Sequence, residues 1–369
     1  MPAPARPYFY KKGANHIMAT MKALRLYGPD DLRLEEVPVP TAPAGGMVIK
    51  VAACAICGSD LRNVKAGGSS HKMKLPAILG HEFSGTITEL GEGVTGFEIG
   101  QQVVCSAIIP CGKCRYCLSG MQNLCEDKNA LSYVVPGGMA EYVMLPALHV
   151  ANGGVHPVPK GYKTEDVCIA EPCSCALNGL ELSDVKFGDT VCVLGAGPLG
   201  IIHCLLAKLR GARKVISVDI MDNRVEQARS FPEIDVAINS AKEDLVARIM
   251  EETDGFGVNC AMVASPSVVA QEQAVQIAAK RGHVNFFGGL PKGSPAVELD
   301  SNVIHYKELF IHGTSDSCNI HIDKILEMFE SGRLDPRRFI THRYPLSQFE
   351  EAFAMAKSGE ALKVILIPD

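Results

Sequence analysis

The sequence lacks an excess of positive charge. Its 36 Lys and Arg residues are outnumbered by 41 Asp and Glu residues, which gives a net charge of -5 and a pI near 6.1. Such a chain has no broad positive field that would attract a nucleic acid backbone or an anionic membrane. The charge balance therefore favours a small-molecule partner, with no nucleic acid and no membrane.

Long apolar runs are also lacking. The stretch VCVLGAGPLGIIHCLLA from Val191 comes closest to membrane-spanning length, but its Gly-rich centre is typical of a strand, a turn and a helix, so we predict no transmembrane segment. Residues 1–20 are basic and contain Pro, yet they lack the apolar core and cleavage site of a secretory signal. We expect an extension there, either disordered or left over from cloning, with the fold starting near Met21.

Cysteine is too sparse for a disulfide-based scaffold. The chain has 14 cysteines in 369 residues, several of them spaced as metal ligands, which favours a reducing cytoplasm. Hydrophobic residues make up 47% of the chain and charged residues 21%, as in ordinary globular proteins. The length exceeds that of a single hydrophobic core, so we expect two domains.

The chain changes character along its length. From Met21 to about Pro159, short β-rich runs such as MVIKVAA and SGTITEL are separated by Gly and Pro clusters, which predicts a barrel-like β domain. From about Ser183 to about Thr314, apolar runs alternate with helix-like segments, which predicts a parallel sheet with helices on both faces. The closing run ALKVILIPD can return to the first domain. The predicted fold class is therefore α/β.

A glycine-rich loop lies between a predicted strand and a predicted helix in VCVLGAGPLG. Its G-x-G-x-x-G spacing puts Gly195 in a tight turn, Gly197 where the backbone approaches a pyrophosphate, and Gly200 where the helix packs on the strand. Pro198 and Leu199 open the helix, whose N-terminus then faces the phosphate. The glycines alone could also serve only a tight turn.

Asp219 ends the next predicted strand, KVISVDI. At this place a carboxylate can accept hydrogen bonds from the adenosine ribose hydroxyls and would repel a 2′-phosphate. Asp219 therefore favours NAD over NADP. Arg224 lies five residues after Asp219, close enough to bind a phosphate of the cofactor. It is therefore also a candidate cofactor-binding residue, and NADP remains the alternative to NAD.

Four cysteines are clustered in CGKCRYCLSGMQNLC. Cys111, Cys114, Cys117 and Cys125 have the spacing C-x2-C-x2-C-x7-C, and four thiolates can complete the tetrahedral coordination of zinc. Because no position remains for water or substrate, this site would be structural. Four free thiols and an iron–sulfur cluster are the alternatives, and colour with metal analysis separates the cluster from zinc.

A second set of metal-ligand residue types is spread along the chain: Cys57 in CAICGSD, His81 and Glu82 in GHEFSG, and Glu171 in AEPCS. One thiolate, one imidazole and one carboxylate leave a fourth position on zinc for water or a substrate oxygen, as in catalytic sites. Spacing alone does not join these residues, because Cys57 could be a core residue and His81 a structural histidine.

Taken together, GHEFSG, CGSD, the four-cysteine segment, Glu171–Pro172 and GAGPLG resemble the zinc-containing medium-chain dehydrogenase/reductase family, from Met21 to the C-terminus. Glu171–Pro172 is similar to the sorbitol, threonine and galactitol-phosphate dehydrogenase branch rather than to the classical alcohol dehydrogenases, whose third zinc ligand is a cysteine. The resemblance implies a GroES-like catalytic domain from residues 21–175 and 318–369, and a Rossmann NAD-binding domain from residues 176–317. It also implies a homo-oligomer, either a dimer or a tetramer.

The resemblance assigns roles to single residues. It implies that Cys57, His81 and Glu171 bind a catalytic zinc, with Glu82 as a nearby carboxylate that assists exchange of water or ligand. With the four-cysteine site this makes two zinc ions per chain. Ser59 would take the place of the hydroxyl that passes the proton of an alcohol toward the cofactor ribose. Cys54, Cys173 and Cys175 lie beside these positions, and we expect them to be small buried hydrophobes.

Arg62 departs from the family pattern. The family often has a histidine at this position to complete a proton relay, and arginine cannot act as a neutral base near pH 7. Either water or another residue would then finish the relay. The basic residues Arg62, Lys65, Lys72 and Lys74 could instead meet a phosphorylated substrate, although scattered charges of this kind are also typical of a solvated surface.

These observations predict a zinc-dependent oxidoreductase that transfers a hydride from a secondary alcohol or polyol to NAD and yields a ketone. The polyol could be a sugar alcohol or its phosphate. An NADH-dependent carbonyl reductase would use the same site in the opposite direction. The sequence does not determine the direction of the reaction. A noncatalytic zinc- and dinucleotide-binding protein is the other alternative. The open ligand set and Ser59 argue against it, because a structural role needs no exchangeable position.

Overall fold

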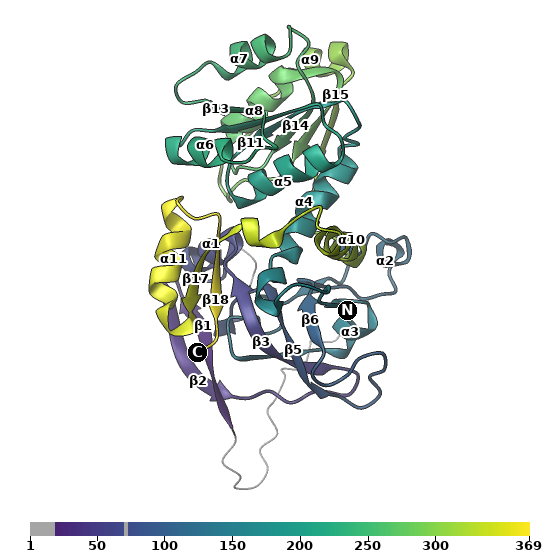
Figure 1. Cartoon of the computed structure of the whole chain (residues 1–369), viewed down its shortest axis with the longest axis vertical. Helices are drawn as coiled ribbons and strands as arrows, with labels where there is room; N and C mark the ends of the chain where they lie inside the picture. The colour runs from purple at the N-terminus through teal and green to yellow at the C-terminus, as the bar shows by residue number, and fades with distance from the viewer. Residues whose placement is uncertain (1–18, 70–72) are drawn as a thin grey trace.

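The computed structural model describes residues 19–69 and 73–369, which form two units stacked along the long axis (Figure 1). Helix α4 (Ala170–Leu182) and the segment between β16 (Phe310–Gly313) and α10 (Asn319–Glu330) join the units. The expected N-terminal extension lies outside the described residues up to position 18, and Lys72 also lies outside them. The predicted domain boundary at residues 175 and 176 falls inside α4.

The upper unit in Figure 1 is built around a parallel sheet in the order β13-β12-β11-β14-β15-β16. The chain runs outward from β11 to one edge and then builds the other half, which is the doubly wound order of a Rossmann fold. Helices pack on the sheet, and every residue of β11 is buried. Besides β16, the strands of this sheet are β11 (Thr190–Leu194), β12 (Lys214–Asp219), β13 (Val236–Asn239), β14 (Val258–Val263) and β15 (Ala278–Phe286). The helices are α5 (Pro198–Leu209), α6 (Asp222–Arg229), α7 (Leu245–Glu252), α8 (Val268–Ile277) and α9 (Ser301–Lys307).

The lower unit holds a mostly antiparallel sheet in the order β10-β6-β5-β3-β18-β17, with β9 also paired to β3. Strand β18, from the closing run of the sequence, lies between β3 and β17, so distant parts of the chain share one sheet. The strands of this sheet are β3 (Met47–Ala55), β5 (Glu82–Leu90), β6 (Gln102–Cys105), β9 (Tyr142–Leu145), β10 (Val155–Pro157), β17 (Ile340–Pro345) and β18 (Lys363–Ile367).

Smaller elements complete the lower unit. A three-stranded sheet comprises β1 (Thr20–Gly28), β2 (Asp31–Pro38) and β4 (Ala77–Ile78), and a two-stranded sheet comprises β7 (Ile108–Ile109) and β8 (Asn129–Ala130). The α-helices are α1 (Gly58–Ala66), α2 (Arg115–Leu118), α3 (Ala147–Ala151) and α11 (Phe349–Ser358). The 3-10 helices are η2 (Gln122–Leu124), η3 (Thr164–Val167), η4 (Pro336–Arg338) and η5 (Leu346–Gln348).

One apolar core continues from the lower unit into the upper one. It includes Leu177 of α4, Ile201 of α5, Phe329 of α10 and Ile365 of β18, all of them buried. Burial of this kind holds packed elements together because apolar area is removed from water. Among the described residues, no helix is both long enough and apolar enough to span a bilayer.

Candidate metal centres and cofactor site

Two adjacent strands bring the first predicted ligands together. Cys57 follows β3 and caps the N-terminus of α1, and His81 and Glu82 lie at the start of β5. Because β3 and β5 are antiparallel, with Ala55 opposite Glu82, the end of one strand meets the start of the other. The ligand atoms of Cys57, His81 and Glu82 all lie within 4.8 Å of one another. A thiolate, an imidazole and a carboxylate at this spacing fit a zinc ion.

Asp60 lies behind this group and is completely buried. One of its carboxylate oxygens accepts a hydrogen bond from the backbone N–H of Cys57 at 3.0 Å, and the other lies 3.8 Å from Nδ1 of His81. Burial by itself lowers the pKa of His81, but Asp60 and Cys57 outweigh it and hold that pKa well above its usual range. A carboxylate facing Nδ1 favours the tautomer whose Nε2 can bind a metal. The acid in CGSD was not among the residues selected from sequence.

Glu82 faces a buried lysine that sequence reasoning also missed. Nζ of Lys363, in β18, lies 2.7 Å from Oε1 of Glu82 and 3.3 Å from the carbonyl oxygen of Ile56. Burial opposes the charge on Lys363, but Glu82 and Cys57 raise the pKa of the lysine above its usual range. A Lys inside an apolar strand was the available signal, because lysine is almost never fully buried without a partner.

Glu171 lies in the first turn of α4 and is buried. Burial raises its pKa to about 7, with His81 opposing and Glu82 adding to the shift. Its carboxylate is not part of the group within 4.8 Å, so Glu171 as a zinc ligand stays a prediction. Sγ of Cys175, one turn later, lies 3.5 Å from Oε1 of Glu171. Cys175 is half-buried and contacts a polar group, whereas Cys54 and Cys173 are buried.

Ser59 lies beside the first metal group, in the first turn of α1, and is buried. Ser59 interacts with the phenol of Tyr133 closely enough to oppose the rise in its pKa, and the Tyr133 ring centre lies 5.9 Å from that of His81. Burial raises the pKa of Tyr133 to about 12, so the phenol stays neutral. Tyr133 was not selected from sequence, because nothing local connects it with Ser59.

The predicted basic group does not assemble into a defined anion site among the residues described. Arg62, Lys65 and Lys74 are all exposed, and Lys72 lies outside the described residues. Binding of a phosphorylated substrate by these side chains therefore stays a prediction.

The four-cysteine lobe, residues 111–125, gathers its sulfurs as the spacing predicts. The four Sγ atoms lie within 4.8 Å of one another, with 3.6 Å between Cys114 and Cys117 and 4.0 Å between Cys111 and Cys117. A tetrahedron with zinc–sulfur bonds of about 2.3 Å has edges of about 3.8 Å, whereas a disulfide bond is about 2.0 Å. All 14 cysteines of the chain are free. The lobe therefore fits a closed four-thiolate metal site.

Backbone amides favour the thiolate form in this lobe. Amides of Lys113 and Cys114 lower the pKa of Cys111, and amides of Cys117 and Glu126 lower that of Cys114 to about 6. Metal binding needs the thiolate, so the loop prepares two of its ligands.

The glycine loop has the geometry expected of a dinucleotide site. Gly195 has φ of 115°, which favours glycine, and a Cβ on Gly200 would lie 1.7 Å from the carbonyl oxygen of Gly195. Gly197 caps α5, with Pro198 as its first residue. The first and third glycines thus serve the turn and the close helix packing that the sequence predicts. Cofactor contacts of this loop, Leu199 included, stay predictions.

Asp219 ties the two cofactor turns together. One carboxylate oxygen accepts from the backbone N–H of Ala196 at 2.8 Å, and the other from Ile220 at 2.8 Å and Met221 at 3.0 Å. Arg224 reaches over the loop, because a Cβ on Gly197 would lie 2.7 Å from its Nη1. A negative and a positive side chain therefore flank the place where the sequence predicts the dinucleotide.

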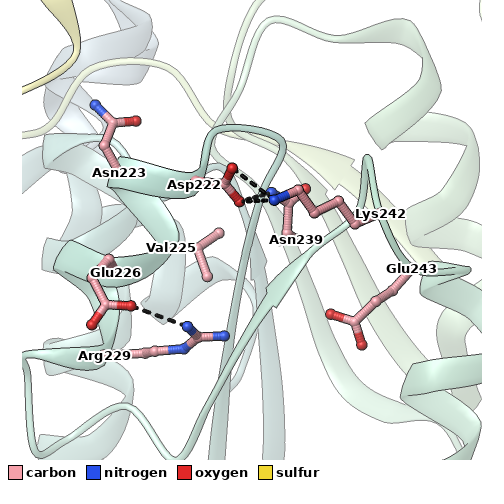
Figure 2. Close-up of a pocket in the computed structure, with 8 residues that line it drawn as sticks. All are labelled: Asp222, Asn223, Val225, Glu226, Arg229, Asn239, Lys242 and Glu243. Atoms are coloured by element: carbon pink, nitrogen blue, oxygen red, sulfur yellow. Dashed lines mark hydrogen bonds and ion pairs between the residues drawn. The ribbon is translucent and has the colours of Figure 1, made fainter.

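An open groove lies along α6 and the end of β13 (Figure 2). Asp222 accepts hydrogen bonds from Asn239 at 2.7 Å and Lys242 at 2.8 Å, and Arg229 pairs with Glu226 at 3.1 Å. These side chains satisfy one another. The groove belongs to the upper unit, whereas both metal groups belong to the lower one, so it takes no part in the candidate metal centres.

Known protein families match both units. A family model described as the alcohol dehydrogenase GroES-like domain matches residues 43–160, and one described as zinc-binding dehydrogenase matches residues 198–330. The chain is 31% identical to a sorbitol dehydrogenase of Halalkalibacterium halodurans, over 94% of this chain and 99% of the relative. It is 32% identical to an L-threonine 3-dehydrogenase of Pyrococcus abyssi, over 95% of this chain and 98% of the relative.

A solved structure agrees. A zinc-binding dehydrogenase from Sinorhizobium meliloti, crystallised with NADP, superposes with a TM-score of 0.88 at 27% identity, covering 95% of this chain and 100% of the other. The predicted fold class, a GroES-like unit with a Rossmann unit, is confirmed. With near-complete coverage of relatives above 30% identity, the chain belongs to the zinc-containing medium-chain dehydrogenase family.

Proposed function

We propose that this chain, a zinc-dependent alcohol or polyol dehydrogenase by family, transfers a hydride from a secondary alcohol or polyol to NAD and yields a ketone. The observation that carries the proposal is that Cys57 and His81, two of the proposed zinc ligands, lie with the supporting carboxylate of Glu82 in a group whose ligand atoms are within 4.8 Å of one another, beside the buried hydroxyl of Ser59. The relative named as a sorbitol dehydrogenase supports a polyol as substrate.

The chain's own residues have distinct parts in this proposal. Cys57, His81 and Glu171 would hold a catalytic zinc, and Cys111, Cys114, Cys117 and Cys125 a structural one. When bound, the catalytic zinc supplies Lewis acidity that eases loss of the alcohol proton, and the dinucleotide accepts the hydride. Ser59 lies buried beside Cys57, where it can take up that proton, and Tyr133 is a neighbour of both Ser59 and His81.

Glu82 and Asp60 have supporting parts. Asp60 orients His81 by facing its Nδ1, and Lys363 holds the carboxylate of Glu82 at 2.7 Å. A carboxylate held by a cation at the edge of the ligand group is placed to assist exchange of water or ligand, as the resemblance implies.

The dinucleotide is proposed to be NAD. The carboxylate of Asp219 supports this choice, because it would repel a 2′-phosphate. The Sinorhizobium meliloti structure was solved with NADP, and Arg224 offers a positive charge over the same loop. NADP is thus the alternative that a direct comparison must decide.

Two further expectations belong to the proposal. A reducing compartment, and hence the cytoplasm, is supported by 14 cysteines that are all free. Association into a dimer or tetramer rests on the family alone.

The test is NAD reduction by zinc-loaded protein across a panel of secondary alcohols and polyols, monitored as NADH absorbance. Cys57→Ser, which removes one predicted ligand, should abolish turnover while the fold is retained in circular dichroism. No NADH formation by the wild-type chain on any panel member would favour the noncatalytic alternative. Activity in Cys57→Ser equal to wild type would remove Cys57 from the site.

A further inference from the structure

A short crossover, residues 314–319, carries the chain from β16 of the upper unit to α10 of the lower unit. It passes between the four-cysteine lobe and α4, the helix whose first turn carries Glu171. Figure 1 shows α4 and α10 side by side at the junction of the units, with α2 of the lobe beyond α10. The crossover therefore has a metal-site loop on one side and the helix of a predicted zinc ligand on the other.

The lobe forms hydrogen bonds with the crossover through two side chains of η2. The amide of Asn123 donates to the carbonyl oxygen of Ser315 at 3.0 Å and accepts from Sγ of Cys318 at 3.1 Å. The side-chain oxygen of Gln122 accepts from the backbone N–H of Asn319 at 3.2 Å. Asn123 is buried, and its donor and acceptor ends both bind the crossover.

Helix α4 binds the opposite side of the crossover. Asn178 donates to the carbonyl oxygen of Asp316 at 2.8 Å, and the hydroxyls of Ser174 and Ser317 are 2.7 Å apart. Ser174 also donates to the carbonyl oxygen of Glu171 at 2.6 Å. Hydrogen bonds from Asn123 and from α4 thus hold residues 315–318 of the crossover from two sides, and the bond from Ser174 continues to the backbone of Glu171.

We propose that Asn123 is a positioning residue that couples the four-cysteine lobe to the junction of the two units and to the start of α4. Asn123 is two residues before Cys125, so the conformation of its 3-10 turn depends on how that cysteine is held. Buried side-chain networks transmit such constraints because each unpaired polar group in them is costly. The lobe then acts beyond its own loop, by fixing the crossover that joins the upper unit, which carries the predicted dinucleotide loop, to the lower unit.

Hydrogen exchange tests the coupling without reference to turnover. In Asn123→Ala, amides of residues 314–319 and of the first turn of α4 should exchange about threefold to tenfold faster than in the wild type, as expected for the loss of one or two hydrogen bonds. Gln122→Ala should speed exchange at Asn319 in particular. The matched control is Asn259→Ala, since Asn259 accepts from the backbone N–H of Thr190 at 2.9 Å inside the upper unit.

Kinetics give a second readout. The KM for the dinucleotide should rise in Asn123→Ala by about threefold to tenfold, with metal content per chain unchanged, and it should stay at the wild-type value in Asn259→Ala. This kinetic arm alone rests on the proposed function. If the wild-type chain oxidises no alcohol while exchange changes as expected, the proposed function fails and the coupling stands.

The coupling is overturned by unchanged exchange at residues 314–319 in Asn123→Ala, or by an equal increase there in Asn259→Ala, which would indicate general loosening. If Asn123→Ala does not fold, Gln122→Ala carries the decision by the same criteria. A rise in exchange confined to the lobe, with the crossover unaffected, would also overturn it.

Discussion

Lys363 and Glu82 form a buried ion pair across strand β3. Their side chains are 4% and 1% exposed, and Nζ lies 2.7 Å from Oε1. Lys363 belongs to β18 and Glu82 to β5, the two neighbours of β3, whose end leads directly to Cys57. The pair therefore fixes both sides of the strand that delivers a predicted metal ligand.

Removing one partner should destabilise the protein strongly. Lys363→Met leaves the carboxylate of Glu82 buried without a counter-charge, so the free energy of unfolding in urea should fall by about 3–5 kcal/mol. Lys208→Met breaks a partly exposed pair with Asp235, with side-chain exposures of 29% and 34%, and should cost about 1 kcal/mol or less. Adding Glu82→Gln to Lys363→Met should recover much of the loss. Equal costs for the two lysine variants would contradict the role of burial.

Metal analysis should find two zinc ions per chain. Cys57→Ser should lose one zinc and its turnover but keep its unfolding midpoint, because the first site is proposed to be open and catalytic. Cys111→Ser should lose the other zinc and unfold more readily, because a closed four-thiolate site contributes to folding. A single zinc in the wild type, or a coloured protein containing iron, would be inconsistent with the two assignments.

The dinucleotide preference should depend on the charge of Asp219. The wild type should show a higher kcat/KM with NAD than with NADP, and Asp219→Asn should reduce that ratio by about tenfold, because it removes repulsion of a 2′-phosphate. Asp222→Asn is the matched control, since Asp222 pairs with Asn239 and Lys242 in the groove of Figure 2. A similar change in both variants would mean that overall charge, and not Asp219, sets the preference.

Acid sensitivity should arise in part from His203. This side chain is completely buried in α5, and burial lowers its pKa from about 6.5 to about 3. Because the unfolded chain binds the proton first as pH falls, the stability is present above pH 6.5 and is lost toward pH 3. At pH 5 the loss is about 2 kcal/mol.

His203→Leu should therefore lose less stability between pH 7 and pH 5 than the wild type, measured as the free energy of unfolding in urea. His305→Leu, at an exposed position of α9, should keep the wild-type dependence. If His203→Leu and the wild type lose the same stability over this range, His203 is not a source of the acid sensitivity.

Local patterns were predictable from sequence, and long-range partners were not. The turn at Gly195 and the lobe around Cys111 are each set within a few dozen residues, so spacing sufficed to predict their geometry. The neighbours Tyr133 and Lys363 reach the first metal group only through tertiary packing, and no periodicity connects them with it. Asp60 could have been selected from sequence, because it lies only three residues after the predicted ligand Cys57. Its burial then requires a partner, which the structure shows to be His81.

The position of β18 also determines the order in which the protein can be assembled during synthesis. The ribosome makes β3 and β5 first, then all six strands of the Rossmann sheet, and only afterwards the strand that pairs with Cys54 and Ala55 at the end of β3. Domains generally fold as units while the chain emerges. The upper unit, although it follows β3 and β5 in the chain, can therefore finish folding first. The sheet of the lower unit stays incomplete, and Glu82 lacks its ion-pair partner, until Lys363 is synthesised.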